Sequence, residues 1–249
     1  MNMCKVFAIY PTDKSHTTGF LNRINTFEKR HLGDSWRCFK IHFQDSDHLN
    51  SITAAKDYRF IFFMGHGGES HLCGACGVYG EESVSEIARS ENPNYYNNHN
   101  FINTANIQEF KDKIFCAFSC NSNRNTAKSL GRAAIQSGVR SFIGFGDIPT
   151  DYVDGKTMSK RCIAVYKGVI IRIMKYALLF GIKENLTVRA FVKTIKLLTT
   201  KEIQILMKSK SKIRHKELIL KQLVDFKNEI RVMGDVHARL CYDFVDAIK

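Results

Sequence analysis

Hydrophobic and polar positions divide the first 145 residues into short apolar runs separated by amphipathic or polar segments. Residues 60–64 read Phe-Ile-Phe-Phe-Met, and residues 114–118 read Ile-Phe-Cys-Ala-Phe. Continuous β-branched and aromatic runs of this length are typical of strands that are buried on both faces. Residues 19–31 instead place their apolar side chains at helical spacing. The pattern predicts strands at 5–10, 36–43, 60–64, 113–118 and 141–145, and helices at 19–31, 46–56 and 126–137.

The order of these elements predicts how the strands pair. Strands and helices alternate, and strand-helix-strand units imply parallel strands joined by right-handed crossovers. We therefore expect an α/β fold with a mostly parallel sheet flanked by helices. The helix at 126–137 has Asn125 as its expected N-cap and Gly138 as its C-terminal stop. From about residue 154 the pattern becomes wholly helical, with helices predicted at 156–180, 185–198, 201–230 and 235–248.

Two of the predicted strands stop at a reactive side chain. His66, which is flanked by glycines, follows the run that ends at Met64, and Cys120 follows the run that ends at Phe118. Parallel strands bring their carboxyl ends to one edge of the sheet, where α/β proteins commonly build their sites. A base beside a thiol can remove the thiol proton, and the resulting thiolate attacks a carbonyl carbon. We predict Cys120 as the nucleophile of a cysteine peptidase and His66 as its general base and acid.

The residues around Cys120 resemble a known family. The sequence Phe-Ser-Cys-Asn-Ser at 118–122 lacks the local caspase signature. Together with segments 126–134 and 138–151, it resembles the CHAT and separase branch of the caspase-like (clan CD) cysteine peptidases. The resemblance covers roughly residues 58–200. It implies a caspase-like fold in which a histidine and a cysteine form the catalytic dyad.

The resemblance also has implications for the site and for the domains. The amides of Gly67 and Cys120 would bind the oxyanion, as fixed donors aimed at charge that develops in the transition state. Neither a cofactor nor a metal would take part. We expect a peptidase domain over residues 1–200 and a basic helical extension over residues 201–249, packed on or beside it.

The resemblance bears on substrate preference as well. Separases and several relatives cleave after basic residues, because a carboxylate lies in their first specificity pocket. The loop after the strand at 141–145 offers Asp147, Asp151 and Asp154. Asp151 is the best match and Asp147 the second, which predicts cleavage after Arg or Lys. Two alternatives remain open, because aspartates in such loops also cap turns and helices and because CHAT-type relatives also prefer apolar residues.

Composition indicates the compartment. The chain has 249 residues and eight cysteines, which is far below the cysteine density of a disulfide scaffold. The first ten residues show no secretory signal, and no apolar stretch reaches the roughly 18 residues of a membrane span. We expect a cytoplasmic protein without a membrane partner, in a reducing compartment that keeps Cys120 as a thiol.

The positive charge is concentrated in the C-terminal part of the chain. Of the formal net charge of +13, residues 151–249 contribute +11, with 21 Lys or Arg against 10 Asp or Glu. Basic clusters such as that at 208–216 bind nucleic acid or acidic proteins, or form the solvated face of a helix. An inactive caspase-like scaffold that binds such a partner through its helices is therefore an alternative function.

The segment that follows the candidate histidine offers a competing set of ligands. His66, His71, Cys73 and Cys76 fall within eleven residues and include one CxxC pair, which suits zinc. A zinc-bound His66 would lose its lone pair and could not act as the base. The long segment at 69–109 is expected to shape substrate entry or to become ordered when a protein or ligand activates the enzyme. A protein substrate is the expected partner, and the resemblance implies a role in bacterial defence or cell-death signalling.

Overall fold

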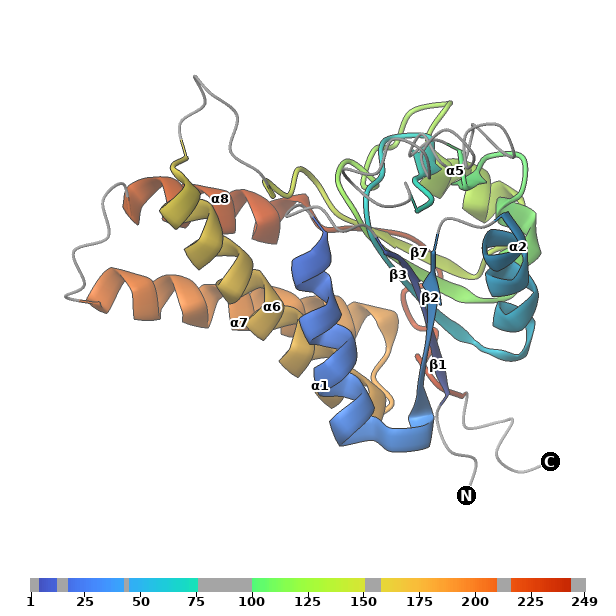
Figure 1. The fold of residues 1–249 in the computed structure, drawn as a ribbon, viewed down its shortest axis with the longest axis horizontal. Helices are drawn as coiled ribbons and strands as arrows, with labels where there is room; N and C mark the ends of the chain where they lie inside the picture. The colour runs from blue at the N-terminus through green and yellow to red at the C-terminus, as the bar shows by residue number, and fades with distance from the viewer. Residues whose placement is uncertain are drawn as a thin grey trace.

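A six-stranded sheet forms the centre of the molecule, with helices on both faces (Figure 1). The computed structural model describes residues 5–12, 18–42, 45–75, 100–150, 158–209 and 216–242. The strand order is β2-β1-β3-β6-β7-β8; the first five strands pair in parallel, and β8 is antiparallel to β7. The strands are β1 (Val6–Pro11), β2 (Trp36–Ile41), β3 (Phe60–Met64), β6 (Ile114–Phe118), β7 (Ser141–Gly144) and β8 (Arg231–Gly234). A separate antiparallel pair joins β4 (His71–Leu72) to β5 (Ile102–Asn103).

The three central strands are apolar because both of their faces are covered. Every residue of β1, β3 and β6 is buried. Successive side chains point to opposite faces of a strand. Phe60 and Phe62 accordingly lie in one hydrophobic cluster, whereas Ile61 and Phe63 lie in the other. The predicted α/β fold with a mostly parallel sheet is therefore confirmed.

The helices form a layer on each face of the sheet (Figure 1). Side-chain caps start the two longest ones, because the hydroxyls of Ser159 and Thr187 accept hydrogen bonds from the amides three residues later. One layer contains α1 (Asn22–Leu32), α6 (Lys160–Lys183), α7 (Val188–Lys208) and α8 (Lys216–Glu229). The other contains α2 (Asp45–Ala54) and α5 (Leu130–Gln136). Short 3₁₀ turns occupy Gly19–Leu21, Gly33–Ser35, Ala55–Asp57 and Ile107–Phe110.

The helix after β6 begins later than predicted. α5 starts at Leu130, and the Oγ of Ser129 accepts a hydrogen bond of 3.4 Å from the Arg132 amide. The expected N-cap, Asn125, is therefore wrong, because the residues between it and Ser129 form turns rather than helix. Gly138 follows the helix with a φ of 87°, a left-handed conformation that favours glycine.

The C-terminal part differs most from the predicted pattern. α7 runs unbroken to Lys208, so the separation predicted between helices 185–198 and 201–230 is wrong. The domain boundary predicted after residue 200 lies inside α7. β8 adds a strand to the sheet where only helices were expected. The last predicted helix is also wrong over residues 235–242, and its remaining residues lie outside the described part of the chain.

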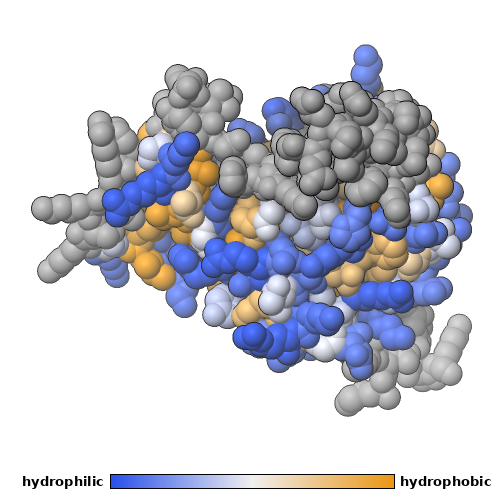
Figure 2. Space-filling model, in the orientation of Figure 1, coloured by the Kyte–Doolittle hydropathy of each residue, from blue (hydrophilic) through white to orange (hydrophobic). Residues whose placement is uncertain are grey.

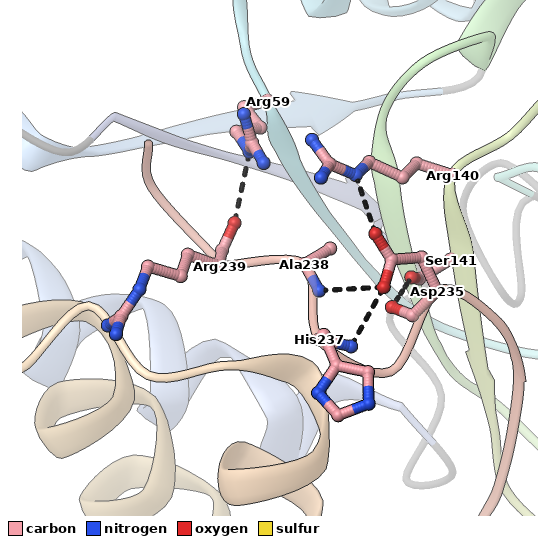
Figure 3. Close-up of polar contacts among 7 residues, drawn as sticks. All are labelled: Arg59, Arg140, Ser141, Asp235, His237, Ala238 and Arg239. Atoms are coloured by element: carbon pink, nitrogen blue, oxygen red, sulfur yellow. Dashed lines mark hydrogen bonds and ion pairs between the residues drawn. The ribbon is translucent and has the colours of Figure 1, made fainter. Parts of the chain in front are cut away.

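Asp235 turns the chain after β8 at the end of the sheet (Figure 3). Its carboxylate accepts hydrogen bonds from the amides of His237 at 2.8 Å and Ala238 at 3.1 Å, and from Nε of Arg140 at 3.1 Å. The residues that follow form backbone hydrogen bonds with the segment that leads into α7. An aspartate that holds the amides two and three residues later favours a turn over a helix, which explains the error in the prediction.

Apolar side chains also reach the surface of the helical layer. Tyr176 and Phe180 on α6 and Leu197 on α7 are 53%, 51% and 69% exposed, and they line a groove together with Lys183 and Lys201. Figure 2 shows apolar surface over the helical layer, interspersed with hydrophilic side chains. Among the residues that the structure describes, no helix combines the length and the apolar character that a membrane crossing requires.

Candidate active site

The pairing of β3 with β6 brings His66 and Cys120 to the same edge of the sheet. The two strands are parallel, and Met64 is paired with Phe118. The Gly65 amide extends this ladder by donating to the Phe118 carbonyl at 3.3 Å. His66 lies two residues after Met64, and Cys120 lies two residues after Phe118. Because Met64 and Phe118 are paired, His66 and Cys120 are equally far along their neighbouring strands. Neighbouring strands lie about 4.8 Å apart, so the two residues start from adjacent positions on this edge.

The two side chains line one narrow pocket, with a volume of about 20 Å³ that suits a single water molecule. β2 and β3 lie on opposite sides of β1, so the direction in which successive strands are added to the sheet reverses after β2. A reversal of strand order opens a crevice at the carboxyl ends of the strands. The segments after four strands form the walls. They contribute Thr18, Phe20 and Leu21 after β1, Gly65 and His66 after β3, Phe118, Ser119 and Cys120 at the end of β6, and Ile148 and Thr150 after β7.

The turn that carries Cys120 is held by the buried hydroxyl of Ser122. This hydroxyl donates to the Ala117 carbonyl at 2.8 Å and accepts from the Phe145 amide at 2.9 Å. Asn121 has a φ of 55°, a left-handed conformation that asparagine adopts more readily than most residues. The turn is thus joined both to its own strand and to β7, which fixes the position of the thiol.

β7 approaches this turn so closely that only glycine fits at Gly144. A Cβ on Gly144 would lie 2.3 Å from the carbonyl oxygen of Ser122 and 2.8 Å from the Cα of Asn123. Both contacts are with backbone atoms, which cannot rotate away. Gly144 therefore sets the distance between β7 and the turn, in keeping with the role of strand glycines at close backbone approaches.

Cys120 is a partly buried thiol that is protonated at rest. Burial raises its pKa, the nearby Asp147 carboxylate raises it further, and backbone hydrogen bonds offset only part of the increase. The Sγ atom donates a hydrogen bond of 3.4 Å to the carbonyl of Ile148. Because the thiolate is the nucleophile, attack from this site requires a base. His66 lines the same pocket.

Gly67 lies beside the pocket, where it packs against Ser119. A Cβ on Gly67 would lie 2.7 Å from the Oγ of Ser119 and 3.0 Å from Cδ2 of Leu72. Ser119 directly precedes Cys120. The two residues predicted to supply oxyanion donors, Gly67 and Cys120, therefore both adjoin Ser119.

A short hairpin determines the direction of the Gly67 amide. Gly67 pairs with Leu72 across an antiparallel bridge. The hydrogen bonds that flank this bridge run from the amide of Gly68 at 2.9 Å and from the amide of Cys73, which donates to the His66 carbonyl, at 3.0 Å. In a pair of this kind the amides of the two bridged residues point away from each other. The Gly67 amide therefore points out of the hairpin.

The structure places only one of the predicted specificity carboxylates. Asp147 is exposed and is not among the residues that line the pocket. Its amide donates to Oε2 of Glu229 on α8 at 3.2 Å, and its carboxylate acts electrostatically on the Cys120 thiol. Asp151 and Asp154 lie outside the described residues. Asp147 is therefore near the site, although it does not form the wall that the prediction assigned to a specificity residue.

Sequence reasoning missed the contribution of α8. Burial is the main cause that raises the pKa of Tyr166 on α6, and the nearby acidic groups of Asp147, Asp225 and Glu229 raise it further. Two of these groups belong to α8, in the segment that was predicted to be a helical extension packed on or beside the peptidase domain. No local signal could have placed them here, because their position depends on how α8 packs in the helical layer.

Most residues that line the pocket were absent from the predicted site, among them Thr18, Ser119 and Ile148. Thr18 is 3% exposed and Ser119 is 2% exposed, and neither side-chain hydroxyl has a hydrogen-bond partner in the described structure. Ser119 could have been found from its position beside Cys120. Thr18 and Ile148 follow other strands, so only the three-dimensional strand order brings them to the site.

The residues of the competing zinc set that are described do not form a metal site. Within the described ranges, no group of three or more His, Cys, Asp or Glu is arranged to hold a metal ion. Nδ1 of His71 lies 3.4 Å from the Oγ of Ser70, and Cys73 is buried. Cys76 lies outside the described residues. His66 thus belongs to the pocket with Cys120 and not to a described metal cluster.

No protein-family model matches the chain, and no curated protein or solved structure matches it significantly. The resemblance to CHAT and separase peptidases therefore depends on the sequence itself, on the His-Gly element at 66–67 and on segments 118–122, 126–134 and 138–151.

Proposed function

We propose that this protein is a cysteine endopeptidase of the caspase-like type, with Cys120 and His66 as its catalytic dyad. The observation that carries the proposal is the shared pocket, in which a thiol and an imidazole leave neighbouring parallel strands at the same level. The pocket lies at the carboxyl edge of the sheet, beside its topological reversal, where α/β proteins bind ligands. The fixed turn around Cys120 adds support, because a nucleophile must be held in position to react efficiently.

The reaction follows from these groups. His66 takes the proton of the Cys120 thiol as Sγ forms a bond to the scissile carbonyl carbon, and the carbonyl electron pair moves onto oxygen. The amides of Gly67 and Cys120 stabilise this oxyanion. His66 then protonates the leaving amine as the C–N bond breaks, which leaves an acyl-enzyme. Water, deprotonated by His66, attacks the thioester and releases the acid product and the thiol.

The resting pocket requires a change before a peptide enters. Its volume of about 20 Å³ is too small for a substrate side chain, and the Cys120 thiol donates to the Ile148 carbonyl. Substrate binding must therefore displace the Ile148 carbonyl from Sγ, so that the thiol proton passes to His66. This requirement suits an enzyme that an activating protein or ligand switches on.

We further propose that the enzyme prefers a basic residue before the cleaved bond. Asp147 is exposed and acts electrostatically on Cys120, and the Glu229 carboxylate accepts a hydrogen bond from the Asp147 amide, so two carboxylates lie on the Asp147 side of the site. A positively charged side chain would be attracted to such a region. Asp151 stays part of this proposal on the strength of the resemblance alone.

Cleavage of a proteome-derived peptide library, read by mass spectrometry, tests the proposed activity. The wild type is expected to produce new termini at a consistent sequence motif, with Arg or Lys before the cut. Cys120→Ala and His66→Ala should each abolish these cuts. Cys38→Ala and His71→Ala are matched controls, because both residues are partly buried and lie outside the pocket.

Three outcomes would contradict the proposal. Cuts that persist in Cys120→Ala would remove the assigned nucleophile. Cuts that persist in His66→Ala would remove the assigned base. A library left intact by the wild type, with Cys120 also unreactive toward peptide electrophiles, would favour the inactive scaffold. Cuts of unchanged motif in Asp147→Asn would overturn only the assignment of Asp147 to specificity.

A further inference from the structure

The pocket contains two polar groups that the proposed dyad does not use. The hydroxyls of Thr18 and Ser119 are both buried, and neither has a hydrogen-bond partner in the described structure. Leaving a buried hydroxyl without a partner is unfavourable, and most buried polar groups are paired. Both residues line the pocket that contains His66 and Cys120. Two such groups in one pocket point to a ligand that supplies the missing partners.

The surroundings of Ser119 indicate which part of a ligand it would meet. Its Oγ would lie 2.7 Å from a Cβ on Gly67, so it sits directly against the glycine that is proposed to supply an oxyanion donor. Its backbone continues into Cys120, the other proposed donor. A hydroxyl at this place is next to where the carbonyl oxygen of a bound peptide would lie.

Thr18 lies on the wall that follows β1. Its carbonyl is already used, because it accepts from the Leu21 amide at 2.8 Å and from the Tyr10 hydroxyl at 3.2 Å. These bonds fix the backbone of Thr18 while its side-chain hydroxyl is left without a partner. The backbone of Thr18 is thus held in place, and its side-chain hydroxyl is available to a ligand.

We propose that the hydroxyls of Ser119 and Thr18 are substrate-binding groups that hydrogen-bond the peptide backbone in this pocket, with Ser119 donating to the carbonyl oxygen at the cleaved bond. The inference rests on the proposed peptidase function, because the ligand it names is that enzyme's substrate. A hydroxyl both donates and accepts, so it can pair with either a peptide carbonyl or a peptide amide. This use explains why the two groups are unpaired before substrate binds.

The test compares two rates of covalent modification at Cys120 in the full-length protein. A peptidyl acyloxymethyl ketone requires a bound peptide backbone, whereas iodoacetamide reports only the reactivity and access of the thiol. Ser119→Ala and Thr18→Val are expected to lower the second-order rate of the peptide probe about 10-fold each, the loss typical of one hydrogen bond. The iodoacetamide rate should stay unchanged, and the urea midpoint should not fall, because neither hydroxyl has a partner to lose in the described structure. Thr18→Ser should restore the peptide rate.

Matched controls are available among buried hydroxyls outside the pocket. Ser51 donates to the His48 carbonyl at 2.7 Å, and Thr199 donates to the Ile195 carbonyl at 2.8 Å. Ser51→Ala and Thr199→Val should lower the urea midpoint, because they remove bonded hydroxyls, and leave the peptide rate unchanged. The site variants are thus expected to lower the rate of the peptide probe, and the control variants are expected to lower the urea midpoint.

The failure of this inference is distinguishable from failure of the proposed function. If the wild type reacts with the peptide probe no faster than with iodoacetamide, both are overturned. If the wild type prefers the peptide probe and the site variants keep that preference, only the proposed substrate-binding roles of Ser119 and Thr18 are overturned. Equal losses with both reagents, or a lowered urea midpoint in the site variants, would show that the hydroxyls support structure instead.

Discussion

The two ends of the parallel sheet differ in whether the polar groups of one cluster have hydrogen-bond partners. At the carboxyl end, the pocket of His66 and Cys120 contains the buried, unpaired hydroxyls of Thr18 and Ser119. At the opposite end, beyond β8, the Asp235 carboxylate accepts three hydrogen bonds, two from amides and one from an arginine (Figure 3). Arg59 likewise donates to the Arg239 carbonyl at 3.0 Å.

What distinguishes the pocket within the described structure is that two unpaired hydroxyls lie together in it, because the unpaired groups of Glu28 and Tyr166 do not line it. A polar group that stabilises a fold is paired within the protein, because burial without a partner is costly. Natural proteins tend to break this rule where a site is kept ready for a ligand. The hydrogen bonds of Asp235 therefore stabilise the fold, and the pocket at Cys120 is the candidate functional site.

The largest effect is expected where the site meets the sheet. Gly144→Ala places a methyl group 2.3 Å from the Ser122 carbonyl oxygen, so β7 and the Cys120 turn must separate. We expect a loss of about 3 kcal/mol in the free energy of unfolding by urea, together with loss of Cys120 reactivity toward peptide probes. Gly168→Ala is the matched control, because the nearest atom to its new methyl is an Arg172 nitrogen at 4.0 Å.

Gly168 lies inside α6, where alanine should stabilise the protein by about 0.5–1 kcal/mol. The two Gly→Ala substitutions thus have opposite expected signs. If Gly144→Ala is as stable and reactive as the wild type, the close approach of β7 does not determine the position of the nucleophile.

A second effect concerns an unpaired group outside the pocket. Both carboxyl oxygens of the buried Glu28 on α1 lack a hydrogen-bond partner in the described structure, and burial raises its pKa to about 9, although Lys175 acts to lower it. Between its unfolded value of 4.5 and about 9, the folded state holds a proton that the unfolded state releases. Stability should therefore decrease as pH rises through this window, by up to about 1.4 kcal/mol per unit.

Glu28→Gln should remove this contribution, because a glutamine does not titrate. Urea unfolding of both proteins at pH 6, 7 and 8 gives the difference between their stabilities, in which the effects of other titrating groups cancel. The stability of the variant relative to the wild type should increase from pH 6 to 7 and again from pH 7 to 8. A difference that is constant with pH would contradict the raised pKa and would mean that Glu28 has a partner.

A smaller effect is expected at the opposite end of the sheet. Burial acts to raise the pKa of Asp235, but the hydrogen bonds from His237, Ala238 and Arg140 outweigh it and hold the pKa below its ordinary value. Asp235→Asn should cost about 1 kcal/mol at pH 7. Because the folded pKa is lowered, this contribution is present above the unfolded pKa and is lost as pH falls through the folded one.

The wild type and Asp235→Asn should therefore converge in stability as the pH is lowered from 7 to 3. The exposed Asp34 supplies the control, and Asp34→Asn should change little at either pH. An Asp235→Asn protein that is as stable as the wild type at pH 7 would show that the paired network does not stabilise this end of the sheet.

Much of the carboxyl end of the sheet could be predicted from sequence. The runs that end at Met64 and Phe118 are apolar because both faces of their strands are covered, and that same pattern placed His66 and Cys120 on one edge. β8 could not be read in this way. Its four residues are at least partly exposed, and it becomes a strand through pairing with β7, which lies about 90 residues earlier in the chain.

The same distinction explains the site residues that sequence reasoning missed. Ser119 was available beside Cys120, whereas Thr18 and Glu229 reach the site through the strand order and the packing of α8. The predicted cap at Asn125 failed because Ser129, four residues later, offers an equally good capping side chain. Local patterns determined the strands, and long-range packing determined what surrounds the thiol.

The central claim is that His66 activates Cys120 across their shared pocket. The most direct test is the rate at which a peptidyl acyloxymethyl ketone modifies the wild type, His66→Ala and the control His71→Ala, with the adduct located by mass spectrometry. The account predicts an adduct on Cys120 that forms at least about 100-fold more slowly in His66→Ala and at the wild-type rate in His71→Ala. An adduct on another cysteine, or equal rates in the wild type and His66→Ala, would contradict it.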